Sequence, residues 1–181
     1  MYFGKWHDIE VEDDVTAYLE FANGATGLFV TTTGDAPGTN RFEVTLDRAK
    51  LVCENDELTM YELEQGLTEH CATCPEGFKK PEGKWVTVET DGENLQHAGI
   101  MRAFVGNVLR GEPLVARGEE GINGLMLSNA MHLSAFLGKE VELPIDEDLF
   151  YEELKKRIAT SRHKTTTVEA VVADLSNTFG G

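Results

Sequence analysis

Residues 14–33 read DVTAYLEFANGATGLFVTTT and predict the first part of the fold. Apolar side chains occupy alternate positions of the first half, which is the pattern of a strand with one buried face. These residues are Val15, Ala17, Leu19 and Phe21. Asn23 and Gly24 follow, the pair favoured by a two-residue type I′ turn, because both central positions of that turn need a positive φ. Residues 25–33 are rich in Thr, Val and Phe and predict the returning strand of a hairpin.

Further strands are expected up to residue 89. Gly34 to Gly38 breaks the second strand, and alternation resumes over residues 41–47. Residues 50–54 and 58–64 predict a second hairpin across Asn55 and Asp56, and residues 84–89 predict a short strand. Between them, residues 65–83 contain several Gly and Pro residues and no period, so we expect a long surface excursion without regular structure.

The period changes to that of helices after Gly92. One apolar stripe runs from His97 to Leu109, and the helix that carries it is expected to end at Gly111. A second stripe runs from Ile122 to Leu137. Its helix is expected to begin at the acidic pair Glu119 and Glu120 and to end at Gly138. Asp146 is expected to cap a third helix that carries Leu149, Phe150, Leu154 and Ile158.

This order, strands first and helices afterwards, predicts an α+β fold: a largely antiparallel open sheet with helices packed on one face. We expect a single domain over residues 1–162. For the tail at residues 163–181, a further helix over residues 168–175 and disorder both remain open.

Composition excludes several classes of protein. The net charge of −16 argues against a nucleic-acid partner, which would need clustered Lys and Arg. We find neither a signal peptide nor an apolar run long enough to span a membrane. Three cysteines do not suggest a secreted disulfide scaffold. We therefore expect a cytoplasmic protein without nucleic-acid or membrane partners.

Four segments in order resemble the C-terminal domain of one enzyme family. They are residues 8–45, the run from Gln96 to Phe104, the run from Leu114 to Gly124, and the run from Val141 to Phe150. Together they span roughly residues 8–162 and are similar to the glucose–fructose oxidoreductase, inositol dehydrogenase and rhizopine-catabolism family (Gfo/Idh/MocA). Its members are NAD(P)-dependent oxidoreductases of sugars and polyols. The chain departs from the usual pattern at residues 46–49, where a glycine normally ends the strand.

The resemblance implies a substrate-binding and oligomerisation domain without its nucleotide-binding Rossmann domain. The family's Gly-rich turn, lysine motif and Asp–His pair are not found, so we expect no catalytic residue, no bound cofactor and no activity from this chain alone. NAD or NADP would belong to the parent enzyme. Gly118, Gly121 and Gly124 have a suggestive spacing but lie at a helix start, where close packing is the expected role.

The resemblance also implies a homo-oligomer formed through the open face of the sheet. The hairpin strands carry apolar or β-branched residues on both faces, and helices can cover only one of them. An uncovered apolar face favours burial against a second copy. A stand-alone binding or assembly module of the same fold, without catalytic activity, is the alternative.

The residues from Gly34 to Arg41 are the best candidates for sugar or polyol contact. Asp35, Thr39, Asn40 and Arg41 offer the donors and acceptors that hydroxyl groups need. A tight turn that uses these residues for backbone reasons alone is the other interpretation. His97 could bond a sugar hydroxyl, or it could pack in the first turn of its helix.

The sequence His70-Cys71-Ala72-Thr73-Cys74 is the one metal-like pattern. C-x-x-C gives two thiolates suited to zinc, and His70 or Cys53 could add a ligand, so a zinc-binding module is a further alternative. A second paired motif is lacking, and a redox C-x-x-C should open a helix after a strand. We therefore expect two ordinary loop thiols and no metal.

Overall fold

The computed structural model describes residues 10–93 and 95–162. In these residues strands come first and helices predominate afterwards, so the predicted α+β class is confirmed. Contacts divide the chain into two compact units, residues 11–116 and Glu10 with residues 117–162, and each is described by itself. The single domain expected over residues 1–162 stays a prediction. The predicted tail at 163–181, with its further helix over 168–175, lies outside the described residues.

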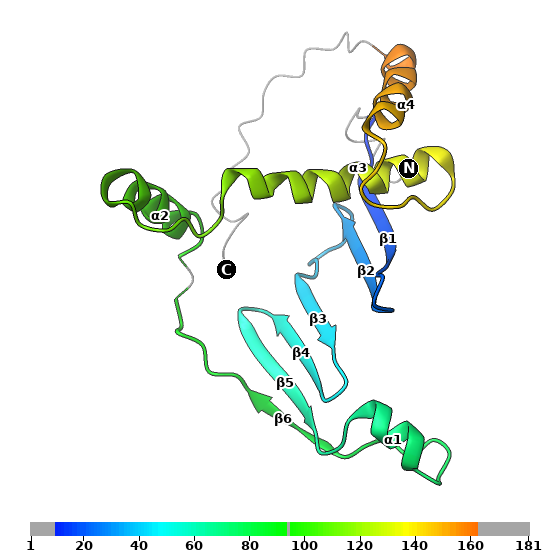
Figure 1. Cartoon of the computed structure of the whole chain (residues 1–181), viewed down its shortest axis with the longest axis vertical. Helices are drawn as coiled ribbons and strands as arrows, with labels where there is room; N and C mark the ends of the chain where they lie inside the picture. Colours follow the sequence, from blue (N-terminus) through cyan, green and yellow to red (C-terminus); the bar gives the residue numbers. More distant parts are fainter. Residues whose placement is uncertain (1–9, 94, 163–181) are drawn as a thin grey trace. The chain divides into compact units, whose positions relative to one another are not determined.

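The first hairpin pairs β1 (Asp14–Glu20) with β2 (Thr26–Thr32), antiparallel as predicted (Figure 1). Val15, Ala17 and Leu19 are half-buried and alternate with exposed neighbours, which confirms the alternation of β1.

The predicted two-residue type I′ turn of this hairpin is wrong. The N–H of Phe21 donates to the carbonyl of Ala25 at 2.9 Å, and the N–H of Gly24 donates to the carbonyl of Phe21 at 2.8 Å, so the loop has three residues. Gly24 has a φ of 85°, whereas Asn23 does not adopt a positive φ. The Asn23 side chain instead accepts the N–H of Ala25 at 3.0 Å. A type I turn closed by one left-handed glycine results.

A second sheet contains β3 (Arg41–Thr45), β4 (Ala49–Glu54), β5 (Glu57–Leu63) and β6 (Gly83–Thr87) in that order, each antiparallel to the next. Asn55 and Asp56 connect β4 to β5 with φ values of 54° and 60°, so the predicted second hairpin is confirmed. The described strands form two sheets, because β1 pairs with β2 alone while β3 pairs forward with β4.

The register gives the second sheet two different faces. One face carries the ionic side chains of β3 and β4, and the other carries mainly apolar side chains. The apolar residues are Phe42, Val44, Leu51, Leu58, Met60 and Val86. Phe42 is 70% exposed, so this apolar face is not fully covered within the described residues.

The expected structureless excursion over residues 65–83 is wrong in one respect: it contains the helix α1 (Leu67–Thr73). Its cap comes from a distant turn. Asp47 accepts the N–H of Thr68 through its side chain at 2.8 Å and the N–H of Leu67 through its carbonyl at 2.8 Å. The first N–H groups of a helix need such partners, and local sequence patterns do not reveal one so far away.

The helix α2 (Gln96–Arg110) confirms the first predicted helix, and Gly111 ends it with a φ of 69°. Its apolar stripe lies exposed. Ile100, Phe104 and Val108, for example, are 52%, 54% and 66% exposed. The predicted packing of helices on one sheet face therefore stays a prediction, since α3 and α4 belong to the other unit.

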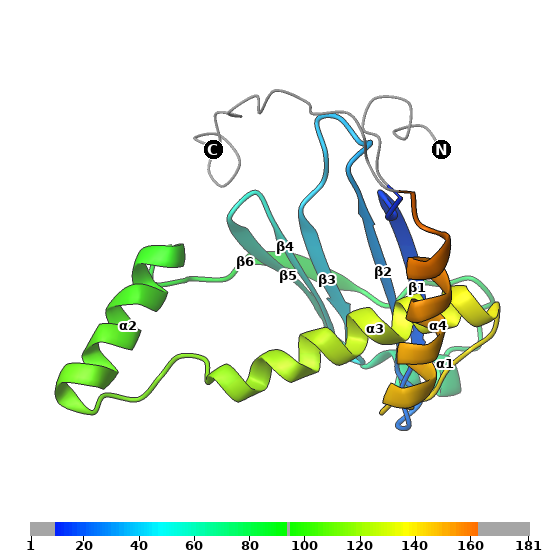
Figure 2. The same ribbon diagram turned by 90° about the horizontal axis from the view of Figure 1, so that it is seen from above.

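In that other unit, η1 (Gly118–Glu120) leads into α3 (Gly121–Leu137), and α4 (Glu147–Thr160) lies beside α3 (Figure 2). Both helices were predicted, and the Asp146 side chain accepts the N–H of Leu149 at 3.0 Å as the expected cap.

The core of this unit consists of the buried Ala130, Leu133 and Ile145, with Phe150 packed against them. Arg157 lies over the ring of Phe136, 3.4 Å from its centre. Among the described helices, none is long and apolar enough to cross a membrane.

Candidate functional site

The polar loop between β2 and β3 carries three of the predicted substrate residues. Asp35, Thr39 and Asn40 are all exposed, and Gly38 turns the chain with a φ of 82°. The N–H of Gly34 donates to the hydroxyl of Thr32 at 3.0 Å, which holds the start of the loop. The loop thus presents carboxylate, hydroxyl and amide groups to solvent.

Arg41, the fourth predicted residue, begins β3 and is bound within the sheet. Its guanidinium lies 2.6 Å from Glu43 and 2.7 Å from Glu54. Glu43 also accepts Lys50 at 2.5 Å, so four alternating charges share the polar face. Arg41 keeps 41% of its side chain exposed, and each of its two terminal nitrogens binds one of these carboxylates.

These bonds shift the pKa values of Glu43 and Arg41 toward the charged forms. Hydrogen bonds from Lys50 and then Arg41 lower the pKa of Glu43, and hydrogen bonds to Glu43 and then Glu54 raise the pKa of Arg41. Both shifts favour the ion pair between Glu43 and Arg41 at neutral pH.

An aromatic pair continues the same face. Tyr61 stands opposite both Lys50 and Trp85 in the register, and the rings of Tyr61 and Trp85 are 5.2 Å apart at 59°. Trp85 is 59% exposed. Sequence analysis did not single out this pair, because only the register of β5 and β6 brings the two rings together.

His97, the fifth predicted residue, lies in the first turn of α2 and is exposed. The structure places it on a different element from the loop that holds Asp35, Thr39 and Asn40. Residues 88–95 separate its helix from β6. His97 and the loop belong to the same compact unit, but this does not bring them together around a substrate.

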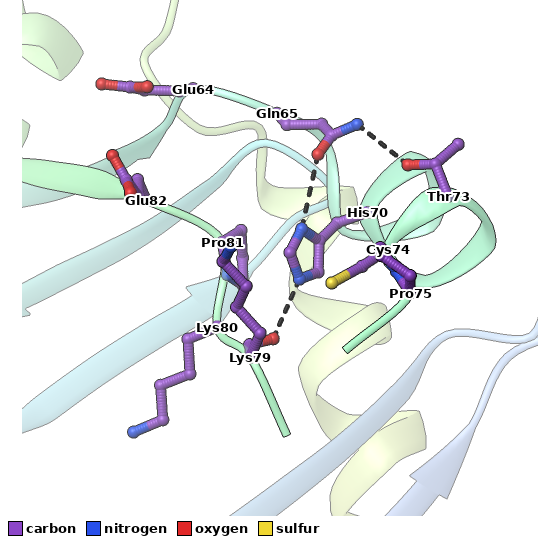
Figure 3. Close-up of a pocket in the computed structure, with 10 residues that line it drawn as sticks. All are labelled: Glu64, Gln65, His70, Thr73, Cys74, Pro75, Lys79, Lys80, Pro81 and Glu82. Carbon is purple, nitrogen blue, oxygen red and sulfur yellow. Dashed lines mark hydrogen bonds between the residues drawn. The ribbon is translucent and has the colours of Figure 1, made fainter. Parts of the chain in front are cut away.

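A hollow in the described residues lies beside α1 and has a volume of about 330 Å³ (Figure 3). It is lined by the residues just before α1, by the C-terminal end of α1, and by the segment that leads to β6. Its walls include Gln65, His70, Cys74, Lys79 and Glu82.

His70 connects two walls of this hollow through the contacts of its ring. Its Nε2 atom lies 2.9 Å from the carbonyl oxygen of Lys79, which makes Nε2–H the donor. Its Nδ1 atom lies 3.4 Å from Oε1 of Gln65, whose amide nitrogen donates to the hydroxyl of Thr73 at 3.3 Å. Figure 3 shows the ring standing between Gln65 and Lys79, which lies in the segment that leads to β6. This packing explains why an excursion rich in Gly and Pro can be held in place.

The C-x-x-C motif lies at the end of α1. Cys71 is exposed in the helix, and Cys74 is the half-buried residue that ends it. In the part of the chain that the structure describes, no three His, Cys, Asp or Glu side chains gather closely enough to hold a metal ion. The trio of the zinc alternative, His70, Cys71 and Cys74, is thus not assembled as a ligand set here.

Comparison of the sequence with models of known protein families found no match, and comparison with curated proteins found none either. The resemblance to the Gfo/Idh/MocA family therefore rests on the residues quoted for it, and the function is a proposal.

Chemically, the described residues offer polar and ionic binding groups. The loop offers free polar groups, the second sheet offers an ionic face with an aromatic pair, and α1 offers a dithiol beside a hollow. Both ring nitrogens of His70 face oxygen atoms, those of Gln65 and Lys79.

Proposed function

We propose that the chain is the substrate-binding and oligomerisation domain of an NAD(P)-dependent sugar or polyol oxidoreductase of the Gfo/Idh/MocA type. By itself it would be inactive. The proposal rests on the four family-like segments, which occur in the family's order over residues 8–162, and on the confirmed α+β class. The structural observation that carries it is the exposed apolar surface of the strands.

The first hairpin carries this surface on its outward face. Tyr18 stands opposite Leu28, and Thr16 stands opposite Val30, so these side chains share one face. Tyr18, Leu28 and Val30 are 65%, 70% and 57% exposed. Monomeric proteins seldom expose large contiguous apolar patches, so such a face favours association. A two-fold arrangement would bury the same face on both copies.

In this proposal the loop between β2 and β3 forms one wall of the substrate pocket. Asp35, Thr39 and Asn40 are exposed, and their oxygen and nitrogen atoms suit polyol hydroxyls. Arg41 would support the loop from its ion pairs with Glu43 and Glu54. His97 would contribute a hydrogen bond from α2.

In this proposal the chain itself does not bind the nicotinamide nucleotide. Its pyrophosphate is received where a Gly-rich turn joins a strand to a helix. Gly118, Gly121 and Gly124 instead follow α2 and a stretch without strand structure. The cofactor, which would supply hydride transfer, and the base that takes the substrate proton would both come from the nucleotide-binding part of the parent enzyme.

Titration with polyols tests the proposal. We expect an inositol, hexose or hexitol to bind weakly, in a saturable manner, as followed by chemical shifts of the backbone amides at residues 34–41. Asp35→Ala and Asn40→Ala should each weaken binding severalfold. Glu89→Ala, which removes an exposed charge elsewhere in the same unit, should not.

Two results would count against the proposal. Self-association with no response to any polyol would favour the non-catalytic assembly module. Saturable binding that Asp35→Ala and Asn40→Ala leave unchanged would remove the loop from the substrate site.

A further inference from the structure

The two cysteines of the C-x-x-C motif lie one helical turn apart. The N–H of Cys74 donates to the carbonyl of His70 at 2.9 Å, which extends the helical bonding of α1 to this residue. Helix geometry then separates the Cα atoms of Cys71 and Cys74 by about 5 Å. That separation lies within the range of about 4.4–6.8 Å that disulfides bridge.

Both thiols can be reached, and one of them is loosely held. Cys71 is exposed, and Cys74 lines the hollow beside His70. Cys74 Sγ has one weak hydrogen bond, to the carbonyl of Glu76 at 3.5 Å. Its ψ of 121° is already outside the helical range, so its side chain can swing without breaking an intact helical turn.

Closing a disulfide here requires a small change at the end of α1. Cβ atoms three positions apart on a helix are about 5–6 Å apart, and a disulfide brings them to about 3.8 Å. The helix has only seven residues, and helices this short have little stability of their own. The last turn can therefore tighten, and Cys74 would leave the wall of the hollow.

We infer that Cys71 and Cys74 form a reversible dithiol–disulfide site that low-molecular-weight disulfides, such as glutathione disulfide, oxidise. This inference goes beyond the proposed function and does not depend on it. The motif closes a helix, whereas thiols activated as in oxidoreductases open one. The site is therefore a target of thiol–disulfide exchange rather than a redox enzyme's centre.

The exchange balances in two steps. The thiolate of exposed Cys71 attacks one sulfur of glutathione disulfide, forming a mixed disulfide and releasing one glutathione thiolate. The thiolate of Cys74 then attacks the sulfur of Cys71, forming the Cys71–Cys74 bond and releasing the second glutathione thiolate. Two protein thiols are oxidised, one glutathione disulfide is reduced, and two protons leave the protein thiols.

Cys53 supplies a comparison within the same chain. It is exposed on β4, on the apolar face of the second sheet, opposite Phe42 and Leu58. Unlike Cys71, it has no second cysteine three positions along the chain. Its reaction with glutathione disulfide should therefore stop at the mixed disulfide. Cys71 should pass through that state to the internal bond.

The experiment treats the reduced full chain with mixtures of reduced and oxidised glutathione, followed by acid quenching and peptide mass mapping. We expect the peptide that contains Cys71 and Cys74 to lose the mass of two hydrogens, while Cys53 gains one glutathione. In Cys74→Ser, glutathione should remain on Cys71 at a level at least about tenfold higher than in the wild type, because the resolving thiol is gone.

A structural readout accompanies the masses. Oxidation should shift the ring resonances of His70, which lines the same hollow, and leave those of His132 on α3 unchanged. Glutathione retained on both Cys71 and Cys74 of the wild type would overturn the inference. So would both thiols staying reduced while Cys53 reacts.

Discussion

Asp47 and Thr68 stand 21 positions apart, yet the Asp47 carboxylate accepts both the N–H and the hydroxyl of Thr68, at 2.8 and 2.7 Å. A turn between β3 and β4 thereby caps α1. Gly66, just before the helix, is buried, and a Cβ there would overlap the Asp47 carboxylate. The capped helix in turn positions His70 and the two cysteines.

Removal of this cap should loosen α1 and leave the strands folded. In Asp47→Ala, we expect faster amide hydrogen exchange over residues 67–73, because the first N–H groups of the helix lose their acceptors. Gly66→Ala should act in the same direction by displacing the carboxylate. Asp35→Ala, at an exposed position, is the control. Unchanged exchange in Asp47→Ala would show that the cap does not hold the helix.

The cap should also respond to acid. Hydrogen bonds from the hydroxyl and N–H of Thr68 lower the pKa of Asp47 from its ordinary value of 3.8. A lowered folded-state pKa means that the stabilisation is complete above pH 3.8 and is lost as the pH falls through the lower value. The protection of residues 67–73, which compares their exchange rate with that of an unstructured chain at the same pH, should therefore fall in this acidic range in the wild type but change little in Asp47→Ala.

A second carboxylate makes a stronger pH prediction for the other unit. Glu10 accepts the hydroxyl of Ser161 at 2.6 Å and the N–H and guanidinium of Arg162, which lowers the pKa of Glu10 from 4.5 to about 2. Its stabilising effect should be complete above pH 4.5 and disappear as the pH falls toward about 2.

Thermal unfolding followed by circular dichroism across this range checks the prediction. Glu10→Gln should lower the melting temperature at neutral pH and flatten its dependence on pH below 4.5. Glu142→Gln, at an exposed site, should behave like the wild type. Equal acid profiles for Glu10→Gln and the wild type would contradict the assignment.

The core of the helical unit centres on Leu133, which is only 2% exposed. Leu133→Ala should lower the free energy of unfolding by about 2–5 kcal/mol, through lost apolar burial and the cavity left behind. Leu127→Ala, on the same helix but 42% exposed, should cost much less. Urea denaturation measures both, and equal losses would show that the core lies elsewhere.

The proposal also predicts that the chain does not bind NAD(H) or NADP(H). Calorimetric titration of either cofactor should give no saturable heat, because the described strand-to-helix connection, from β5 to α1, has one glycine and is not the Gly-rich turn that holds a pyrophosphate. A micromolar dissociation constant, about 8 kcal/mol of binding free energy, would contradict the prediction.

Local patterns predicted the elements whose causes are local. Alternation located β1, helical stripes located α2 and α3, and Asp146 marked the start of α4. The pair Asn23–Gly24 was misread because the Asn23 side chain closes the turn itself, while Asn55 and Asp56 adopt the left-handed conformation instead.

Features that depend on distant partners escaped sequence analysis. Nothing near Leu67 in the sequence indicates that Asp47 caps its helix. The loop around Asp35 was located correctly as a break between strands, but Arg41 gave no sign that Glu54 would bind it across the sheet. His70 was considered as a metal ligand, whereas its contacts with Gln65 and Lys79 appear only in the fold.

Self-association of the chain is the most direct test of the account. The exposed face of Tyr18, Leu28 and Val30 should join a second copy, and a stable interface typically buries about 1,600 Å² in total. Light scattering at micromolar concentration should give a dimer or larger for the wild type and for Val115→Glu, an exposed control outside the strands. Tyr18→Glu and Leu28→Glu should give monomers that remain folded by circular dichroism. A wild-type chain with a monomer's mass, or charge variants that associate as the wild type does, would contradict the proposed oligomerisation domain.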